Sequence, residues 1–399
     1  MRILIVHNIL WAHYKASVFQ ALQQLVDQQT DVTVKVLQIA RNERSRADLE
    51  TASDVGTLVY AYDYDLLFDR FLEDISLRSR TRSLLQRAGA FKPDVILLTG
   101  YYDFAQIFLL LWAKAKGIRV VMQNESTLAD QRQGGWKEQF KRRIFSLCDG
   151  FFCFGTQSAN YLIQLGVPPE KILLRKNAVD NDALRVAYEE ALPKRVQEQQ
   201  RLSVRPNNFI FVGRLITFKN LQTLLTAFAD ANEKSSNAQE WGLILLGDGP
   251  EKVSLQQQAD ELGLIDSVQF MSGRPWFQVP DVLALGNVLV LPSWSEPWGL
   301  VVNEALVCGL PVIVSNRCGC VPDLVHDKEN GFVFDPAQPD QLTDLLLRFM
   351  DDKVDLGQLS ESARQSVIPY SPKAVALGML NGFRKVSQSK VTQTAQNQH

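Results

Sequence analysis

The chain has 399 residues, of which 46% are hydrophobic and 22% are charged, with a formal net charge of -2. This length exceeds what one hydrophobic core usually holds, so two domains are expected. The near-neutral charge argues against a nucleic-acid-binding protein, whose surface would be basic, and no apolar run approaches the roughly 20 residues of a membrane-spanning helix.

The amino terminus and the cysteines predict where the protein acts. MRILIVHN enters a strand-like run directly, without the long apolar segment and cleavage site of a signal peptide. Five cysteines, an odd number, fit a reducing compartment better than a set of disulfides. We therefore expect a cytoplasmic protein. Cys318 and Cys320 lie close in sequence, but no second cluster of Cys or His accompanies them, so we expect no metal site there.

Apolar runs and segments of helical periodicity alternate through the first half of the chain. Strands are predicted at 2–6, 32–37, 93–98, 118–122 and 150–154, and helices at 14–25 and 104–116. This alternation is typical of a doubly wound parallel sheet, in which ligands bind at the carboxyl ends of the strands. The turn after the first strand lacks the spaced glycines of a dinucleotide-binding fingerprint.

Asp63 and Asp65 are spaced like an Asp-x-Asp pair that holds a divalent metal ion. They precede a helix-like stretch at 66–75, however, and Asp65 is better interpreted as its N-cap.

Glu125 follows the run 120–124, which continues the predicted strand 118–122 to the edge of the sheet where ligands gather. Its carboxylate is therefore a candidate for orienting or deprotonating an acceptor hydroxyl. A carboxylate that caps a helix or forms a salt bridge is an equally good interpretation of Glu125.

The segment 136–147, WKEQFKRRIFSL, combines aromatic and aliphatic residues with four cations. Such a basic amphipathic segment can lie on an anionic membrane surface. An ordinary surface helix with solvated charges is the alternative interpretation.

The charged, Gln-rich segment 186–207 has few apolar residues and is predicted to be an interdomain linker. A second strand-helix alternation then begins at Phe209. Arg214 and Lys219 follow its first strand, and a planar guanidinium beside an ammonium suits two adjacent phosphates.

The stretch 288–311, VLVLPSWSEPWGLVVNEALVCGLP, reads as a buried strand, a polar loop and a short buried helix that starts near Gly299. The unpaired N–H groups of Gly299, Leu300 and Val301, at the positive end of the helix dipole, favour an anion such as diphosphate. Glu296 lies before this helix and Glu304 more than a turn inside it, so two hydrogen-bond acceptors for diols flank the anion site.

EPWGLVVNEAL, followed by GLPVIVSNRCGCVPDLV and NGFVF, resembles the donor-binding half of the retaining glycosyltransferases of family 4, which have the two-domain GT-B fold. The resemblance is specific over about residues 209–347. It implies that Glu304 binds the nucleotide ribose, that Glu296 contacts the transferred hexose, and that Arg214 and Lys219 hold the donor diphosphate. Many members also place a His near the position of Asn124, and this sequence has none close by.

We therefore expect two Rossmann-like α/β domains that face each other across a cleft. The predicted division is an acceptor-side domain at 1–185, a linker at 186–207, a nucleotide-sugar-binding domain at 208–368, a helix at 369–388 that returns to the first domain, and a disordered tail at 389–399. The expected reaction moves a hexose from UDP-hexose or GDP-hexose to a hydroxyl acceptor, which is a glycan, a lipid-linked molecule or a small molecule. This reaction needs no metal and belongs to polysaccharide or glycolipid biosynthesis. A GT-B-like nucleotide-sugar epimerase and a non-catalytic nucleotide-sugar-binding protein are the alternatives.

Overall fold

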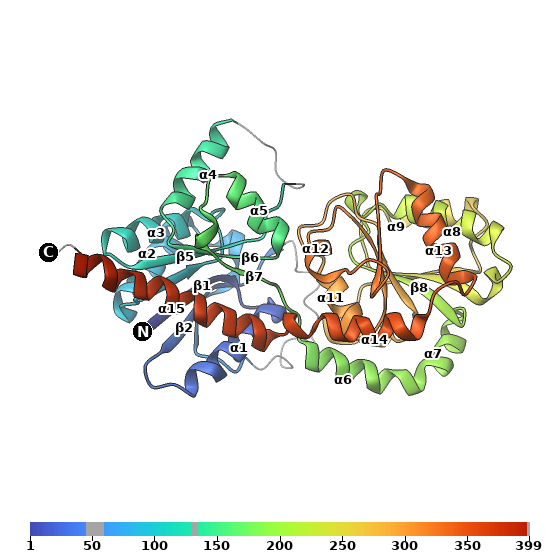
Figure 1. Cartoon of the computed structure of the whole chain (residues 1–399), viewed down its shortest axis with the longest axis horizontal. Coiled ribbons are helices and arrows are strands. Elements are labelled where there is room, and N and C mark those ends of the chain that lie inside the picture. The colour runs from blue at the N-terminus through green and yellow to red at the C-terminus, as the bar shows by residue number, and fades with distance from the viewer. Residues whose placement is uncertain (45–59, 129–134, 397–399) are drawn as a thin grey trace. The chain divides into compact units, whose positions relative to one another are not determined.

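The computed structural model describes residues 1–44, 60–128 and 135–396. It consists of two compact units, the first formed by residues 1–179 with the C-terminal segment from Tyr370, and the second by residues 180–369 (Figure 1). Each unit has one parallel sheet with helices packed on it, so the expected pair of Rossmann-like domains is confirmed.

The sheet of the first unit has seven strands in the order β3-β2-β1-β4-β5-β6-β7, and every neighbouring pair is parallel. Its strands are β1 (Arg2–Ile9), β2 (Thr33–Asn42), β3 (Tyr64–Phe71), β4 (Val95–Leu98), β5 (Arg119–Asn124), β6 (Gly150–Cys153) and β7 (Ile172–Arg175). Its helices are α1 (His13–Asp27), α2 (Leu77–Phe91), α3 (Phe104–Ala115), α4 (Trp136–Ser146), α5 (Thr156–Gln164) and α15 (Pro372–Gln396), with short 3-10 turns η2 (Leu72–Asp74) and η3 (Pro169–Lys171).

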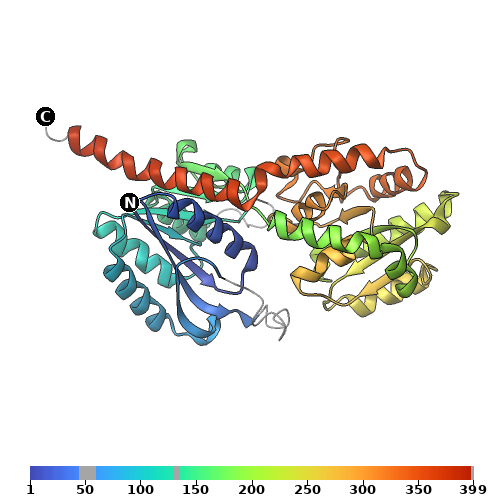
Figure 2. The ribbon, with the colours of Figure 1, turned by 90° about the horizontal axis from the view of Figure 1, so that it is seen from below.

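Alternate residues of each strand face opposite sides of this sheet. Ile3 and Ile5 of β1 belong to a core shared with α1 and α15, whereas Leu4 and Val6 belong to the core on the other face, shared with α2, α3, α4 and α5. Figure 2 shows α15, in dark red, beside α1, in dark blue. The C-terminal helix therefore completes the core of the first unit, as predicted for residues 369–388.

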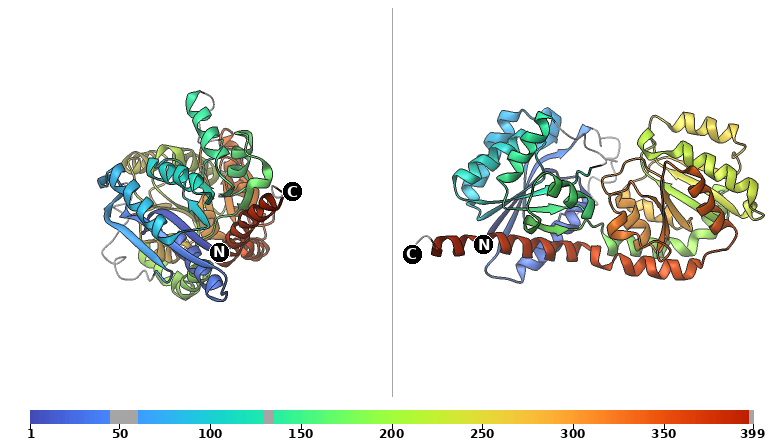
Figure 3. Two further views of the ribbon diagram at one scale, coloured as in Figure 1. Left: turned by 90° about the vertical axis from the view of Figure 1, so that its left-hand side faces the viewer. Right: turned by 45° about the horizontal axis from the view of Figure 1, so that its top comes forward.

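The second unit has a six-stranded parallel sheet in the order β10-β9-β8-β11-β12-β13 (Figure 3). Its strands are β8 (Asn207–Val212), β9 (Trp241–Leu246), β10 (Val268–Met271), β11 (Val288–Leu291), β12 (Val312–Ser315) and β13 (Gly331–Phe334). Its helices are α6 (Asn181–Ala191), α7 (Arg195–Leu202), α8 (Leu221–Lys234), α9 (Lys252–Glu261), α10 (Val279–Leu283), α11 (Leu300–Val307), α12 (Val321–Leu324), α13 (Pro339–Met350) and α14 (Leu356–Ser366). The 3-10 turns are η4 (Leu192–Lys194), η5 (Thr217–Lys219), η6 (Ala238–Glu240) and η7 (Trp276–Gln278), and η8 (Ile368–Tyr370) precedes α15.

Both sheets reverse their winding direction beside their first strand. In the first unit this point lies between β1 and β4, and in the second it lies between β8 and β11. In open α/β sheets, ligands bind outside the carboxyl ends of the strands at such a point. Each unit therefore has one edge at which a site is expected.

The stretch 66–75 consists of the greater part of strand β3 and a 3-10 turn, so the predicted helix and the N-cap role of Asp65 are wrong. Residues 64–71 pair with β2 as an edge strand of the sheet, and only a 3-10 turn follows. Lys35 of β2 forms ion pairs with both Asp63 and Asp65, each at 3.1 Å. The two carboxylates therefore stabilise the pairing of the strands, and tertiary contacts override the local helical pattern.

The segment between the units also differs from its prediction. The first unit ends at Val179 rather than at residue 185, and the predicted linker at 186–207 contains helical residues of α6 and all of α7. Asp180 caps α6 through a hydrogen bond from the Ala183 N–H at 3.1 Å, and the helix buries Leu184 and Tyr188. The buried positions follow helical spacing, so the helix packs as part of the second unit.

The C-terminal helix extends to Gln396, beyond its predicted end at 388. The sequence from Phe383 to Gln396 contains neither Gly nor Pro, so no residue type there terminates the helix. The last three residues of the predicted disordered tail, 397–399, lie outside the described residues.

Candidate functional site

Two loops meet at the carboxyl edge of the second unit's sheet. The loop after β8 continues through η5 to Asn220, and the loop after β11 runs from Pro292 to Gly299. The Asn220 side-chain amide donates to the Pro292 carbonyl at 3.1 Å, and the Trp294 N–H donates to the Phe218 carbonyl at 2.9 Å. These bonds hold together two segments that are more than 70 residues apart in sequence.

Lys219 and Glu296 form a direct ion pair across these two loops. Their side chains are only 17% and 16% exposed, so bulk water screens the pair less than it screens a surface pair. The structure thus brings together two of the residues predicted to bind the donor, with the ammonium of one on the carboxylate of the other.

The backbone of Glu296 is held from its other side by the segment 318–320. The Gly319 N–H donates to the Glu296 carbonyl at 2.8 Å, and a Cβ at Gly319 would lie 1.9 Å from the Pro297 carbonyl oxygen. Only glycine permits this approach. Cys318 and Cys320 are buried, and burial raises the pKa of both thiols. This Cys-Gly-Cys segment therefore serves to support the loop of Glu296.

The N-terminus of α11 points its first N–H groups at the same loop. Gly299 adopts a left-handed conformation with φ of 97°, and no side chain caps the helix. The first intrahelical bond runs from the Val302 N–H to the Gly299 carbonyl, so the N–H groups of Leu300 and Val301 have no acceptor within the helix. These N–H groups are where an anion is predicted to bind, and its binding to residues 299–301 stays a prediction.

Glu304 lies in the second turn of α11 and is partly buried. Burial removes water from its carboxylate and raises its pKa from the ordinary 4.5 to about 7. Among the described residues, none donates a hydrogen bond to this carboxylate. Glu304 is thus an acceptor with no donor among the residues that the structure describes, and its contact with a ligand hydroxyl stays a prediction.

Arg214 is exposed at the same edge of the sheet. Its loop is fixed by the Leu215 N–H, which donates to the Asp248 carbonyl at 2.9 Å. No ion pair of the Arg214 side chain is present within the part of the chain that the structure describes. The structure therefore places Arg214 in the loop after β8 that also leads to Lys219.

The first unit has a cavity of about 200 Å³ at the carboxyl ends of β1, β4 and β5, which we call the first-unit cavity. Glu125 lines it, together with Asn124 and Ser126. His7, at the end of β1, lines it as well, although no His is close to Glu125 in sequence. The Nδ1 of His7 lies 2.9 Å from the Ile9 carbonyl and 3.1 Å from the Gln38 side-chain oxygen, so Nδ1 carries the proton in the neutral ring.

Lys15 of α1 is a buried cation near this cavity that the sequence did not single out. Its ammonium lies 3.7 Å from the centre of the Phe154 ring and 3.5 Å from the Asn177 side-chain oxygen. Burial lowers its pKa from 10.5 to about 8, and the charge of Glu125 partly opposes this shift. Lys15 precedes the buried residues Val18, Phe19 and Leu22 by three, four and seven positions, so helical periodicity places it on the buried face of α1.

Within the ranges that the structure describes, no group of three or more His, Cys, Asp or Glu side chains is arranged to hold a metal ion. None of the helices described is both long and apolar enough to cross a bilayer.

Two family models match the chain, one in each unit. Residues 194–366 match the model described as Glycosyl transferases group 1, and residues 16–183 match Glycosyltransferase Family 4. The D-inositol 3-phosphate glycosyltransferase of Corynebacterium jeikeium is 32% identical over 160 residues, which are 38% of this chain and 38% of that protein. The N-acetyl-alpha-D-glucosaminyl L-malate synthase of Bacillus anthracis is 28% identical over 172 residues, 43% of this chain and 42% of that protein. The matched region thus spans about two fifths of the length of these relatives.

Solved structures share the fold along the whole chain. Alr3699/HepE of Anabaena, in complex with UDP and glucose, has a TM-score of 0.73 at 17% identity and covers 96% of this chain and 100% of its own. Sucrose-phosphate synthase of Thermosynechococcus elongatus has a TM-score of 0.72 at 16% identity, with 98% and 100% covered. At these low identities the solved structures show only that the chain has the GT-B fold. The two family models, in contrast, match the amino-acid sequence of each unit. The chain belongs to the family 4 glycosyltransferases and carries a group 1 glycosyl transferase region in its second unit.

Proposed function

We propose that the chain transfers a hexose from a nucleotide diphosphate donor to a hydroxyl acceptor, with retention at the anomeric carbon. The observation that carries this proposal is the contact of Lys219 with Glu296 beside the N-terminus of α11. This contact puts a cation for a diphosphate and a carboxylate for a sugar at one topological switch point.

The donor diphosphate gains negative charge as the glycosidic bond breaks. Lys219, Arg214 and the N–H groups of 299–301 are the groups of the second unit that stabilise this charge in the proposed reaction. Because these protein groups neutralise the diphosphate, we propose that the reaction needs no divalent metal. The group that leaves is a nucleoside diphosphate, and UDP and GDP are the proposed forms. Alr3699/HepE, which shares the fold, was solved with UDP and glucose.

The carboxylates of the second unit have separate roles in the proposed complex. Glu304, which lacks a protein donor among the described residues, accepts hydrogen bonds from the ribose diol. Glu296 accepts from the hexose hydroxyls and fixes the ring so that the reacting carbon faces the acceptor. Attack from the face of the leaving group requires no protein nucleophile, which is why retention is proposed without a covalent intermediate.

Glu125 is proposed to orient or deprotonate the acceptor hydroxyl. It is exposed and lines the first-unit cavity, so an acceptor in this cavity reaches its carboxylate. His7 lines the same cavity and offers a second polar group for the hydroxyl.

The test is incubation of the purified chain with UDP-, GDP- and ADP-hexoses, with and without sugar and lipid acceptors. Acceptor-stimulated release of a nucleoside diphosphate, with the product in the donor's anomeric configuration by NMR, supports the proposal. Release of an epimerised donor indicates an epimerase, and tight donor binding without turnover indicates a binding protein. Unchanged turnover in both Lys219→Ala and Glu296→Ala contradicts the assigned site.

We also propose that the enzyme works at the cytoplasmic face of a membrane, which α4 contacts. On α4, Trp136 is 75% exposed, and Phe140, Lys137 and Arg143 are exposed as well. Not all of the four predicted cations are available, because Arg142 pairs with Glu138 at 2.9 Å and Lys141 donates to the Tyr161 hydroxyl at 2.9 Å.

Helix α3 adds an apolar face to the same unit. Phe104, Phe108 and Leu111 are all about half exposed and follow helical spacing, so they line one side of the helix. Flotation with liposomes tests the proposal. Binding to vesicles with anionic lipid that falls in Trp136→Ser/Phe140→Ser supports it, whereas equal binding of wild type and variant contradicts it.

A further inference from the structure

We infer that the hydrogen bond between Trp298 and Asn303 fixes the start of α11 for binding of the donor diphosphate, so that Asn303 is a positioning residue. The inference rests on the proposed function, because it concerns the N–H groups that hold the diphosphate in that reaction. Neither Trp298 nor Asn303 is among the residues predicted to contact the donor.

The Trp298–Asn303 bond joins the loop before α11 to the helix itself. The Trp298 indole N–H donates to the Asn303 side-chain oxygen at 2.8 Å, and the two residues are 4% and 1% exposed. Trp298 directly precedes Gly299, the N-cap of α11, and Asn303 is the fourth residue of the helix. Apolar residues at these two positions often pack on each other and fix the angle at which a chain enters its helix. Here a hydrogen bond links them.

This bond acts at a helix start that has little else to define it. Gly299 has no side chain that could cap α11, and its φ of 97° is a conformation that residues other than glycine rarely adopt. The backbone of Trp298 is held by the Cys320 N–H, which donates to the Trp298 carbonyl at 3.1 Å. Trp298 is therefore fixed through its backbone by the segment 318–320 and through its ring by α11.

The amide of Asn303 has a cost that an apolar residue would avoid. Among the residues that the structure describes, none accepts a hydrogen bond from the buried Asn303 Nδ2. A buried polar atom without a partner destabilises the folded state. A leucine at position 303 would avoid this cost and could still pack on the ring of residue 298. We therefore attribute the amide to the orientation that its bond to Trp298 imposes.

Gly299 connects the Trp298–Asn303 bond to the donor-binding groups. A Cβ at Gly299 would lie 3.3 Å from the Glu296 Cγ, so the start of the helix packs on the aliphatic part of that side chain. The N–H groups of Leu300 and Val301, which bind the diphosphate in the proposed reaction, follow Gly299 directly. A rotation of the loop about Gly299 thus displaces these N–H groups and the carboxylate that pairs with Lys219 together.

The test compares nucleoside diphosphates with their nucleosides. Wild type, Asn303→Leu and Trp298→Phe, each as the full-length chain, are titrated with UDP and uridine and with GDP and guanosine. In each variant the affinity for the better-bound diphosphate should fall about tenfold, or about 1.4 kcal/mol, which is close to the loss of one hydrogen bond to a charged group. The affinity for the matching nucleoside should stay unchanged, because the displaced N–H groups face the diphosphate.

The double variant Trp298→Phe/Asn303→Leu separates positioning from stability. Each single variant leaves a buried polar atom without its partner, whereas the double variant replaces both partners by apolar groups. The double variant should therefore recover the melting temperature that the single variants lose. It should not recover the affinity for the diphosphate, since a hydrogen bond fixes a direction and an apolar contact does not.

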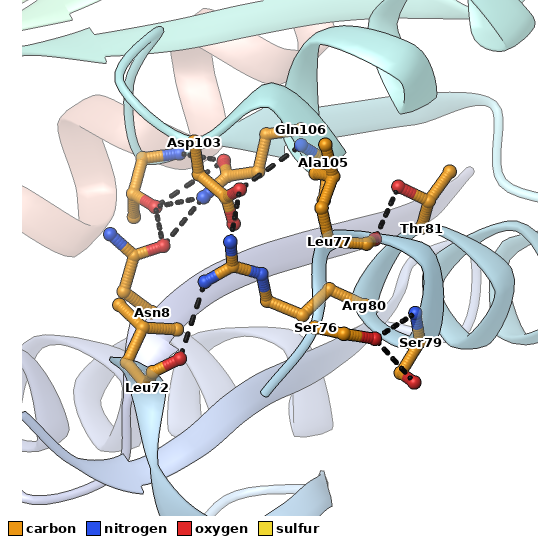
Figure 4. Close-up of polar contacts among 11 residues, drawn as sticks. Asn8, Leu72, Ser76, Leu77, Ser79, Arg80, Thr81, Asp103, Ala105 and Gln106 are labelled. Carbon is orange, nitrogen blue, oxygen red and sulfur yellow. Dashed lines mark hydrogen bonds and ion pairs between the residues drawn. The ribbon is translucent and has the colours of Figure 1, made fainter. Parts of the chain in front are cut away.

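Gln106 of α3 provides the matched control in the first unit. Its side-chain amide is buried to the same extent as that of Asn303, with 1% exposed, and it donates to the Asn8 side-chain oxygen at 2.6 Å (Figure 4). Gln106→Leu removes a buried amide just as Asn303→Leu does. It should lower the melting temperature but leave the affinity for the diphosphate unchanged, because the proposed diphosphate contacts belong to the second unit.

Unchanged diphosphate affinity in both single variants overturns the inference, and so does an equal loss of diphosphate and nucleoside affinity. Recovery of the affinity together with the melting temperature in the double variant also overturns it, because the bond then contributes only stability. Failure of the double variant to fold, while Gln106→Leu folds, has the same consequence.

The proposed function fails separately, if the wild type binds neither UDP nor GDP. Hydrogen exchange then tests the role of the bond without a ligand. The Val302 N–H donates to the Gly299 carbonyl at 2.9 Å in the first bond of α11. The Val302 amide should exchange faster in Asn303→Leu than in wild type, and equal exchange overturns the inference.

Discussion

Replacing Glu304 by Gln should stabilise the protein above neutral pH while weakening its affinity for the donor. The carboxylate has an ordinary pKa of 4.5 when unfolded and a pKa of about 7 when folded, because burial penalises the charged form. The folded state thus binds a proton more tightly, and stability is lost as pH rises from 4.5 to about 7. The difference of about 2.5 pKa units corresponds to about 3 kcal/mol of unfolding free energy above pH 7, at about 1.4 kcal/mol for each unit.

Glutamine has nearly the same shape but no charge, so Glu304→Gln removes this pH-dependent penalty. At pH 8 the variant should exceed the wild type by about 3 kcal/mol, and at pH 5 by less than about 1 kcal/mol. For a unit of this size, this corresponds to a rise in melting temperature of about 2 to 4 °C for each kcal/mol. Calorimetry at both pH values, with separate fitting of the transitions of the two units, measures the difference.

Glu361 of α14 provides the control, because its side chain is 64% exposed. Glu361→Gln should leave the pH dependence of the wild type unchanged. If Glu304→Gln and wild type lose stability in parallel between pH 5 and 8, the carboxylate is not desolvated and the argument is wrong. If the variant is more stable yet binds donor as tightly as wild type, Glu304 does not bind the ribose.

Three further predictions concern the ion pair, the metal and the buried lysine. Removing either partner of the Lys219–Glu296 pair should cost about 1.5 to 3 kcal/mol of unfolding free energy, and removing both should cost less than the sum of the two single costs. The exposed Arg201–Glu198 pair is the control and should show no measurable coupling in the same double-mutant cycle. Turnover should be unchanged in excess EDTA, and a loss that Mg²⁺ or Mn²⁺ restores contradicts the proposed metal-free reaction. The stability of the wild type should rise between pH 8 and 10.5, because in this range the unfolded state still holds the proton that the folded Lys15 has lost. Lys15→Met should abolish this rise. Measuring the free energy of unfolding at several pH values tests the prediction, and an unchanged rise in the variant refutes it.

The elements of the candidate donor site follow from local sequence. Gly299 and the prolines around it separate strand, loop and helix, and the apolar run 288–291 is a buried strand as predicted. The positions of Arg214, Lys219, Glu296 and Glu304 at one edge of one sheet follow from the strand-helix alternation, since the carboxyl ends of parallel strands lie together.

The errors arise where distant residues override local patterns. The stretch 66–75 has the residues of a helix, but its first part, up to Phe71, belongs to the edge strand β3, because β2 offers backbone partners and Lys35 offers a counter-charge to Asp65. Likewise, His7 and Glu125 line one cavity although they are more than 100 residues apart, and only the order of strands in the sheet puts their loops together.

The ion pair of Lys219 with Glu296 and the neutralising shift at Glu304 have a common physical cause. The site contains an ammonium, a carboxylate and a second, partly buried carboxylate, and burial makes each of these charges costly. Lys219 and Glu296 lower this cost by pairing, and Glu304, which has no protein donor in the described part of the chain, does so by holding its proton more tightly. In the proposed reaction a nucleotide sugar supplies phosphate oxygens to Lys219 and hydroxyl donors to the two carboxylates. In the proposed complex Lys219 therefore lies between Glu296 and the diphosphate, and the ribose diol gives Glu304 hydrogen-bond donors that the described residues do not provide.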